Sequence, residues 1–295
     1  MSEGQDTGEV LTVRRALALG IARLREAGIE SAQLDMSLLL AEAIGAPRLA
    51  IYTDPERPLS EEERLRARGM LARRLRHEPV AYILGRREFY GLEFEVTGEV
   101  LIPRPETEHL VERALAWIAE EAETRPAPVV ADIGTGSGAI AVAVAVKAKT
   151  ARVIAVDCSP AALAVARRNV ANHEMADRID FREGDLLAPL AEPVDAILSN
   201  PPYIAEGERV DLPPDVIRHE PHLALFAGPD GLDTIRRLIA DAPIHLSPGG
   251  LLLMECGQGQ AGAIIQLIAA DPRYAAHAIH RDYAGIERVI EARRA

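Results

Sequence analysis

The chain has little cysteine, no long apolar run and no excess of basic charge, and each absence excludes a class of protein. Its 295 residues include only Cys158 and Cys256, so we expect reduced thiols rather than a disulfide framework. Both cysteines end predicted strands, where a small buried apolar side chain is the simplest interpretation. No apolar run reaches the roughly 18 residues of a membrane span. The net charge of −12 disfavours broad binding to nucleic-acid phosphates.

The sequence also shows no pattern typical of a targeting segment, of a metal or triad site, or of a coiled coil. The first residues, Met1–Asp6, are polar and acidic, unlike a secretory signal or a transit peptide, so we expect a cytoplasmic protein. The eight histidines show neither metal-ligand spacing nor a catalytic triad pattern, so we expect no metal. No helix carries a sustained heptad seam, and we expect a monomer.

The length suits two domains, and the first is predicted to be a small helical one at residues 1–85. Residues 1–10 resemble a frayed tail. Thr12, Ser31 and Ser60 are good helix N-caps, and Glu63 completes a capping box with Ser60. The apolar positions predicted to form the core of the first two helices are Val13, Leu17, Ile21, Leu24, Leu34, Leu38 and Leu39.

The third predicted helix is rich in arginine. Its basic residues are Arg64, Arg66, Arg68, Arg73, Arg74 and Arg76. A solvated face is the simplest interpretation, and a contact surface for an acidic partner is the alternative.

Residues 86–103 are predicted to form a β-hairpin linker, and residues 104–295 a second domain of alternating strands and helices. The expected strands are 129–133, 151–156, 179–181, 194–199 and 251–255, followed by an antiparallel pair at 275–280 and 288–291. The expected helices between them are 139–147, 160–173, 234–242 and 261–269. This alternation predicts an α/β fold with a mostly parallel sheet covered by helices on both faces.

The most informative stretch is Asn200-Pro201-Pro202-Tyr203, which directly follows the apolar run 194–199. Two prolines cannot continue a strand ladder, so the strand must end at Asn200. Open α/β sheets bind ligands beyond the carboxyl ends of their strands. We therefore expect a stiff loop at the site, with an amide at its base and an aromatic ring at its tip.

This loop suits a planar group that carries an NH2. The Asn200 side-chain oxygen and the Pro201 carbonyl can accept its two hydrogens, and Tyr203 can stack on its plane. Such a nitrogen is a poor nucleophile, and two fixed acceptors would aim it at an electrophile. The structural alternative is a capped strand followed by a turn and a buried tyrosine.

A glycine loop, Asp132–Gly138, follows the first strand of this domain and opens a helix. Glycines let a backbone approach a ligand, and the helix N-terminus favours an anionic group. Asp157 ends the next strand at a spacing that suits a ribose diol. Asp185 follows the third strand and could accept from an adenine amine, with Leu186 packing on the ring. With Ala139 the loop also fits a nicotinamide dinucleotide pattern, and either aspartate could be only a helix cap.

Taken together, these segments resemble class I methyltransferases that use S-adenosylmethionine, whose sheet is Rossmann-like. The tetrapeptide at 200–203 is shared by adenine-N6 DNA methyltransferases and protein glutamine-N5 methyltransferases. The flanking segments, Gly85–Tyr90, Leu101–Glu108, Glu220-Pro221 with Ala224-Leu225, and Arg281–Tyr283, resemble the PrmC/HemK family. That family methylates the glutamine of the Gly-Gly-Gln motif in bacterial peptide chain release factors. The resemblance covers nearly the whole chain, including the helical domain and the hairpin.

The resemblance implies a set of site residues. For the cofactor, S-adenosylmethionine, it implies Gly134, Thr135, Gly136, Ser137, Gly138, Asp157, Asp185, Leu186 and Asn200. For the substrate amide it implies Asn200, Pro201, Pro202 and Tyr203, with Arg104 near the pocket mouth. Relatives often carry an aromatic residue in place of Leu186.

Three other functions stay open at this point. The first is adenine-N6 methylation of nucleic acid, which needs a basic track for phosphates. The second is glutamine methylation of a large-subunit ribosomal protein. The third, a nucleotide-binding regulator or dehydrogenase-like module, leaves the segment 200–203 unexplained.

Overall fold

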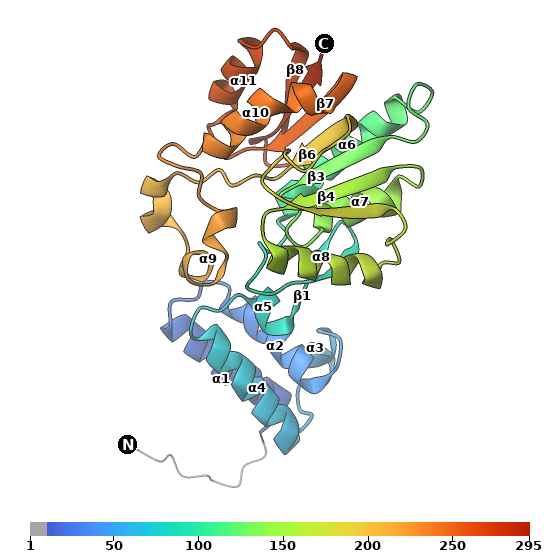
Figure 1. Ribbon diagram of the computed structural model, residues 1–295. Helices are drawn as coiled ribbons and strands as arrows, with labels where there is room; N and C mark the ends of the chain where they lie inside the picture. The colour runs from blue at the N-terminus through green and yellow to red at the C-terminus, as the bar shows by residue number, and fades with distance from the viewer. Residues whose placement is uncertain (1–10) are drawn as a thin grey trace. The chain divides into compact units, whose positions relative to one another are not determined.

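The computed structural model describes residues 11–295, which divide into two compact units (Figure 1). The first unit runs to Gly85 and also includes Pro214–His219. The second comprises Arg86–Pro213 and Glu220–Ala295. The sequence places Pro214–His219 with the second domain, so its membership of the first unit is a product of tertiary packing. The predicted tail at residues 1–10 lies outside the described residues.

The first unit is helical, as expected. Its helices are α1 (Val13–Glu26), α2 (Ala32–Ile44), α3 (Ala50–Thr53), α4 (Glu61–Arg74), α5 (Val80–Leu84) and α9 (Pro214–His219). Two of the predicted N-caps are confirmed: Thr12 caps α1, and Ser60 and Glu63 form the capping box of α4. Ser31 precedes α2, but its side chain makes no capping bond and donates to Asp35 instead. Gly45 ends α2 in the left-handed conformation. Helices α5 and α9 were not expected, because segments of five or six residues are too short to show a helical period.

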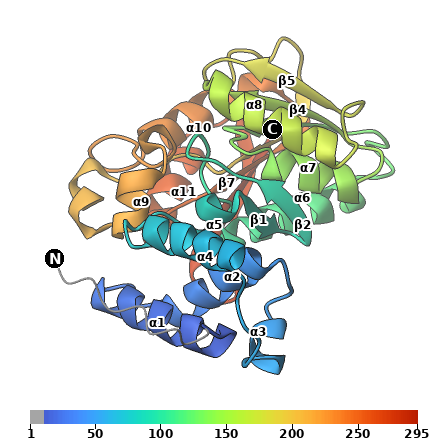
Figure 2. The ribbon, with the colours of Figure 1, turned by 90° about the horizontal axis from the view of Figure 1, so that it is seen from below.

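Helices α1, α2 and α4 pack around one apolar core (Figure 2). Leu24 and Leu39 are fully buried, as predicted. Leu34 was wrongly expected in the core, since 45% of it is exposed. The buried face of α2 is rotated toward Met36 and Leu40 instead, because α1 and α4 flank this helix.

The predicted basic face of α4 is wrong at its C-terminal end. Arg74 is buried, and its Nε lies 2.8 Å from the Asp35 carboxylate on α2. Arg73 forms a paired contact with Glu78, which lowers the pKa of that carboxyl group. These two arginines therefore stabilise the helical unit rather than offer charge to a partner.

Removal of Arg74 should destabilise the first unit strongly. Breaking a buried ion pair leaves an uncompensated charge, so we expect Arg74→Ala to cost about 3–5 kcal/mol. Arg68→Ala, an exposed arginine on the same helix, should change stability by less than about 0.5 kcal/mol. Hydrogen exchange of the α2 and α4 amides, measured in both variants, checks this prediction. Equal exchange rates in the two variants would contradict it.

The second unit is built on a seven-stranded sheet (Figure 1). Its strands are β3 (Val129–Ile133), β4 (Arg152–Asp157), β5 (Ile179–Glu183), β6 (Val194–Ser199), β7 (Leu246–Glu255), β8 (Tyr274–Arg281) and β9 (Glu287–Arg294). Their spatial order is β5-β4-β3-β6-β7-β9-β8. The first five strands are parallel, and β9 is antiparallel to β7 and β8, so the predicted closing pair is confirmed.

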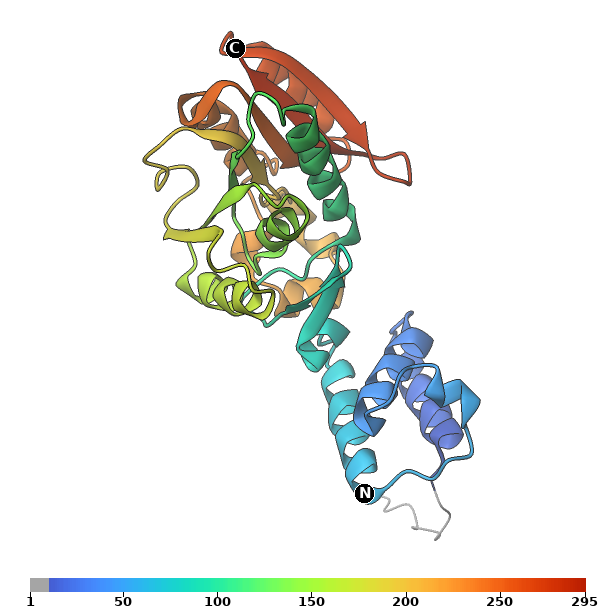
Figure 3. The same ribbon diagram turned by 90° about the vertical axis from the view of Figure 1, so that its right-hand side faces the viewer.

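Helices cover both faces of this sheet, as predicted. They are α6 (Glu108–Glu120), α7 (Ala139–Lys147), α8 (Pro160–Asn172), α10 (Asp233–His245) and α11 (Ala261–Ala269), and 3₁₀ turns η1 (Pro105–Thr107), η2 (Glu206–Asp211) and η3 (His222–Ala224) lie in the loops. Alternate residues of β7 separate into two cores: Leu251 and Leu253 pack with α6 and α7, and Leu252 and Met254 with α10 and α11. Figure 3 shows α6 beside the C-terminal strands.

The predicted hairpin is confirmed as β1 (Arg86–Phe89) and β2 (Leu92–Glu95), an antiparallel pair within the second unit. Tyr90 and Gly91 form its turn, and both have positive φ. This is the geometry of a two-residue turn that matches strand twist. Among the described residues, no helix is long and apolar enough to cross a bilayer.

Candidate active site

The strand register brings four sequence-distant positions to one edge of the sheet. Ile133 pairs with Val156 on one side and with Ser199 on the other, and Ser199 pairs with Met254. The residues that follow these strand positions are Gly134, Asp157, Asn200 and Glu255. The chain moves outward from β3 to β5 and then returns to β6, so this edge is a topological switch point, where open sheets bind ligands.

A cavity of about 320 Å³ opens at this edge. This volume falls within the range of small-molecule sites. Of the residues predicted for the site, those that line the cavity are Arg104, Gly134, Thr135, Gly136, Ser137, Asp157, Asp185, Leu186, Asn200 and Pro202. Gly138, Pro201 and Tyr203 are not among its lining residues.

The glycine loop needs its glycines for two different reasons. Gly134, Gly136 and Gly138 all have positive φ, which other residues adopt at a cost. A Cβ at Gly134 would meet nothing within 4 Å, so the backbone there lies open beside the cavity. A Cβ at Gly138 would press on Ala166 of α8 at 3.2 Å, so this glycine serves helix packing instead.

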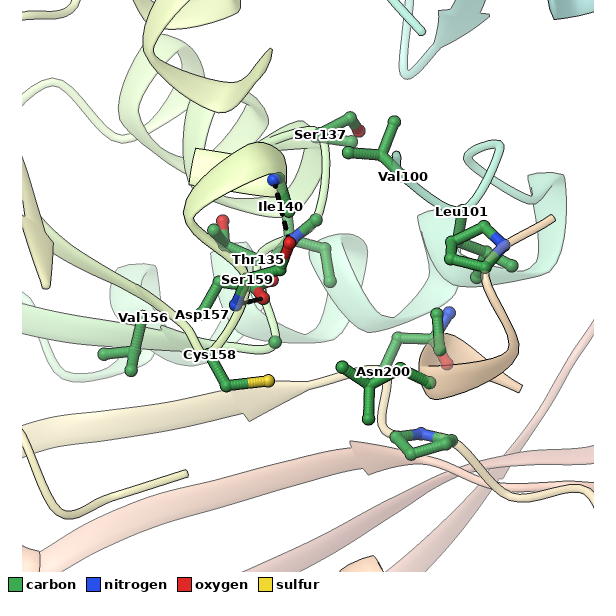
Figure 4. Close-up of a pocket in the computed structure, with 18 of the residues that line it drawn as sticks. Val100, Leu101, Thr135, Ser137, Ile140, Val156, Asp157, Cys158, Ser159 and Asn200 are labelled. Carbon is green, nitrogen blue, oxygen red and sulfur yellow. Dashed lines mark hydrogen bonds between the residues drawn. The ribbon is translucent and has the colours of Figure 1, made fainter. Parts of the chain in front are cut away.

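Asp157 holds the glycine loop and also lines the cavity. One carboxylate oxygen accepts from the Gly136 amide at 2.8 Å, and the other accepts from the Ser159 amide at 2.9 Å. Burial raises the pKa of this carboxyl group, although the backbone hydrogen bonds oppose that shift. Each oxygen keeps a second lone pair for a ligand. In Figure 4, Thr135, Asp157 and Ser159 cluster on one side of the pocket, and Asn200 and Leu101 lie on the other.

Asp185 and Leu186 lie at the rim of the same cavity. The Asp185 carboxylate is exposed and lies 2.5 Å from the guanidinium of Arg237, another lining residue that the sequence did not indicate. Leu186 has a left-handed backbone with φ of +48°. Such strain in a non-glycine residue is common at ligand sites.

Arg104 lines the cavity and is held there by a buried carboxylate. Its guanidinium lies 2.5 Å from Glu220, and the other Glu220 oxygen accepts from the Ile102 amide. Glu220 is 4% exposed and comes from a segment 116 residues further along the chain. It therefore ties the segment before η1 to the loop that follows β6.

Asn200 is oriented by Thr107, a residue of the segment Leu101–Glu108 for which the sequence indicated no role. Its Nδ2 lies 3.0 Å from Thr107 Oγ1, and Thr107 in turn donates to the Glu255 carboxylate at 2.6 Å. The Tyr203 hydroxyl donates to the other Glu255 oxygen at 3.2 Å. The Tyr203 ring is thus half-buried. Glu255 is the last residue of β7, the strand beside β6. This position at a strand end is the one feature of the sequence that could have indicated a place for Glu255 in the site.

The two cysteines differ in environment. Cys256 is buried as predicted, and burial raises the pKa of its thiol to about 12. Cys158 was also expected to be buried, but it is exposed and lines the cavity next to Asp157. Within residues 11–295, no group of three or more histidine, cysteine, aspartate or glutamate side chains is arranged to hold a metal ion.

Asp132, the first residue of the glycine loop, is fully buried. Its Oδ2 accepts from the Thr135 hydroxyl at 2.6 Å and the Ala141 amide at 3.1 Å, whereas Oδ1 has no partner among the described residues. Burial outweighs these bonds and raises the pKa of the carboxyl group to about 7. The folded chain therefore holds this proton over a pH range in which an unfolded aspartate has lost it.

This buried proton predicts a pH dependence of stability. The folded pKa lies above the unfolded one, so the stabilisation is present below pH ~4 and is lost as the pH rises toward about 7. Relative to Asp132→Asn, the wild-type free energy of unfolding should fall with a slope of up to about 1.4 kcal/mol per pH unit. Urea unfolding of both proteins at pH 5, 6, 7 and 8 measures this slope. Parallel curves for the two proteins would contradict the raised pKa.

Solved structures place this fold among the methyltransferases. The chain resembles a methyltransferase from Pyrococcus furiosus with a TM-score of 0.50 and 19% identity, over 76% of this chain and 98% of that one. It resembles the hMettl16 catalytic domain, solved in complex with MAT2A 3′UTR hairpin 6, with a TM-score of 0.54 and 18% identity, over 76% and 81% of the two chains. Together with the site at the switch point, these similarities define a class I methyltransferase fold.

Similarity in sequence is much closer. Residues 15–85 match the family described as PrmC N-terminal domain, and residues 111–222 match the methyltransferase small domain. The release factor glutamine methyltransferase of Bradyrhizobium diazoefficiens is 44% identical over 98% of this chain and 96% of its own length. That of Geobacter sulfurreducens is 41% identical over 97% and 98%. The chain belongs to the release factor glutamine methyltransferase family.

The methyl donor of this family is S-adenosylmethionine, and the cavity fits it. The open backbone at Gly134 leaves room for a ligand against the helix N-terminus, as a carboxylate group requires. The carboxylates of Glu99 and Asp157 line the cavity and suit a ligand with positive charge.

Proposed function

We propose that this protein transfers a methyl group from S-adenosylmethionine to the side-chain amide nitrogen of the glutamine in the Gly-Gly-Gln motif of peptide chain release factors. One observation carries the proposal. The Asn200 amide has its nitrogen engaged by Thr107, while no described residue donates to its oxygen, and it lies at a cavity beside the glycine loop. An acceptor in this setting is suited to a substrate NH2 group.

The cofactor side of the cavity would hold the donor. Of the residues that line the cavity, Gly134, Thr135 and Gly136 would offer backbone to its methionine part, Asp157 would accept from its ribose, and Asp185 with Leu186 would flank its adenine. When bound, S-adenosylmethionine supplies a methyl group that is activated by a positively charged sulfur.

The chain's own residues then prepare the nucleophile. Asn200 Oδ1 and the Pro201 carbonyl accept the two amide hydrogens of the substrate glutamine, which fixes its nitrogen and favours the positive charge that the nitrogen gains. Pro202 lines the cavity and would pack on the planar amide, whereas Tyr203 supports the loop from outside the cavity lining through its hydrogen bond to Glu255. The nitrogen gains a methyl group and releases one proton. No side-chain nucleophile is required by this scheme.

The alternatives are less well supported. Adenine-N6 methylation needs a basic track, yet the net charge is −12, and Arg73 and Arg74 of the arginine-rich helix α4 are already paired with carboxylates. Methylation of a ribosomal protein would use the same pocket, but the relatives above are named for release factors. A dehydrogenase-like function would leave the position of Asn200 at the cavity unexplained.

Mass spectrometry after incubation with S-adenosylmethionine tests the proposal. The substrates are a release factor, the same factor with the Gly-Gly-Gln glutamine changed to alanine, a ribosomal protein fraction and duplex DNA. We expect one added methyl group on the release factor and none on its variant. Methylation of DNA or of a ribosomal protein alone would overturn the substrate assignment.

We further infer that the enzyme acts as a cytoplasmic monomer without direct contact to nucleic acid. The acidic net charge supports this. Light scattering at micromolar concentration gives the oligomeric state, and a second species at twice the mass of 31.9 kDa would contradict it.

A further inference from the structure

The Asn200 amide can be held in two orientations that differ by a half-turn, and only one of them offers an oxygen to the substrate. An NH2 group donates and a carbonyl oxygen accepts, so a reversed amide would repel the NH2 of a glutamine. Packing alone separates the two orientations poorly, because the NH2 and the oxygen are nearly the same size. An interaction other than shape complementarity must therefore fix the orientation of the Asn200 amide.

The hydrogen bonds that begin at Asn200 lead through Thr107 to the Glu255 carboxylate, a group that can only accept hydrogen bonds. An ionised carboxylate has no hydrogen, so both hydroxyls that contact Glu255 must donate to it. The 2.6 Å distance between Thr107 Oγ1 and Glu255 Oε2 is typical of a hydroxyl donating to a charged carboxylate. Once the single Thr107 hydrogen is used in this way, its oxygen can only accept. Asn200 must then turn Nδ2 toward Thr107, as observed at 3.0 Å, and Oδ1 away.

Glu255 is placed to carry this role. It is 1% exposed, so water does not compete for its oxygens. Burial raises the pKa of the carboxyl group above its ordinary value, and the Thr107 hydroxyl, the positive charge of Arg288 and the Tyr203 hydroxyl limit this rise. The other Glu255 oxygen accepts a hydrogen bond from the Tyr203 hydroxyl at 3.2 Å. One carboxylate therefore contacts both ends of the loop 200–203, at Asn200 through Thr107 and at Tyr203 directly.

We propose that Glu255 and Thr107 are positioning residues, which set the Asn200 amide so that its oxygen faces the substrate nitrogen. This inference rests on the proposed function, since it assigns to Asn200 the role of acceptor. Neither residue touches the reacting atoms. Their effect on turnover depends on the Asn200 side chain. A merely structural role would not show this dependence.

The test is a double-mutant cycle on turnover of a release factor at saturating S-adenosylmethionine. Thr107→Val removes the hydroxyl at similar volume, and we expect it to lower kcat by roughly 10- to 100-fold. In an Asn200→Ala background the same change should lower kcat by less than about twofold. Thr107→Ser, the matched control, keeps the hydroxyl and should recover most of the lost rate. Additive effects of Thr107→Val and Asn200→Ala would overturn the proposal.

Glu255→Gln provides a second and independent test. Glutamine has the shape of the carboxylate but a single acceptor oxygen, so it cannot accept from both Thr107 and Tyr203. We expect kcat to fall at least tenfold with the melting temperature changed by only a few degrees. A glutamine variant with wild-type turnover would overturn the proposal, because a neutral group would then suffice. If wild-type enzyme itself leaves the release factor unmethylated, the proposed function fails instead, and the two failures are thus distinct.

Discussion

Asn200→Ala should lower turnover by roughly 10²–10³-fold, while binding of S-adenosylmethionine changes little. Asn200 supplies one oriented acceptor to the substrate amide, and loss of one such group in a water-poor site costs this much in other enzymes. The remaining acceptor, the Pro201 carbonyl, is backbone and survives the substitution. The rate is measured as single-turnover methylation of a release factor, with cofactor affinity measured separately by calorimetry.

The control for this prediction is the same chemical change at an exposed position. Asn172 lies at the exposed end of α8, and Asn172→Ala should keep turnover within about twofold of the wild type. Near-normal turnover in Asn200→Ala would refute the mechanism. A loss of turnover matched by an equal loss of cofactor affinity would move the role of Asn200 from substrate to cofactor.

Gly231→Ala should be the most damaging glycine substitution near the site. Gly231 has φ of +74°, and a Cβ there would overlap the carbonyl oxygen of Tyr203. That carbonyl is also held by Gln260 Nε2 at 2.8 Å, so it has little freedom to retreat. The loop 200–203 must shift, and a shift of about 1 Å costs about 10²-fold in rate. Steady-state kinetics with a release factor measure this loss.

Gly285→Ala separates the steric effect from the backbone effect. Gly285 has a similar φ of +79° in the β8–β9 turn, but a Cβ there would meet nothing within 4 Å. Both variants carry the cost of a left-handed alanine, about 1 kcal/mol. Only Gly231→Ala should lose activity beyond that cost, and equal activity in the two variants would show that the loop tolerates the displacement.

Much of the cofactor side of the site could be predicted because its signals are local. A strand followed by closely spaced glycines and a helix requires positive φ and an open backbone wherever it occurs. Asp157 and Asn200 could be placed together because parallel strands end at the same edge of a sheet. The capping box of Ser60 and Glu63 is local in the same sense.

The partners of these residues could not be predicted in this way. Glu255 lies 148 residues from Thr107, and no local pattern indicates that a carboxylate at the end of β7 should be buried. The same holds for Glu220 beside Arg104, for Arg74 beside Asp35, and for the inward turn of Tyr203.

The α/β fold, the strand ends that carry the site, and the amide and glycine loop that define its chemistry could therefore all be predicted from the sequence. Each of these depends on hydrophobic period, on backbone geometry, or on the fixed polarity of parallel strands. The pairing of buried charges depends on the packing of distant elements, since burial makes an unpaired charge costly and the elements that pack together bring the partners into contact. The orientation of Asn200 belongs to this second group, because it is set by a carboxylate on the neighbouring strand.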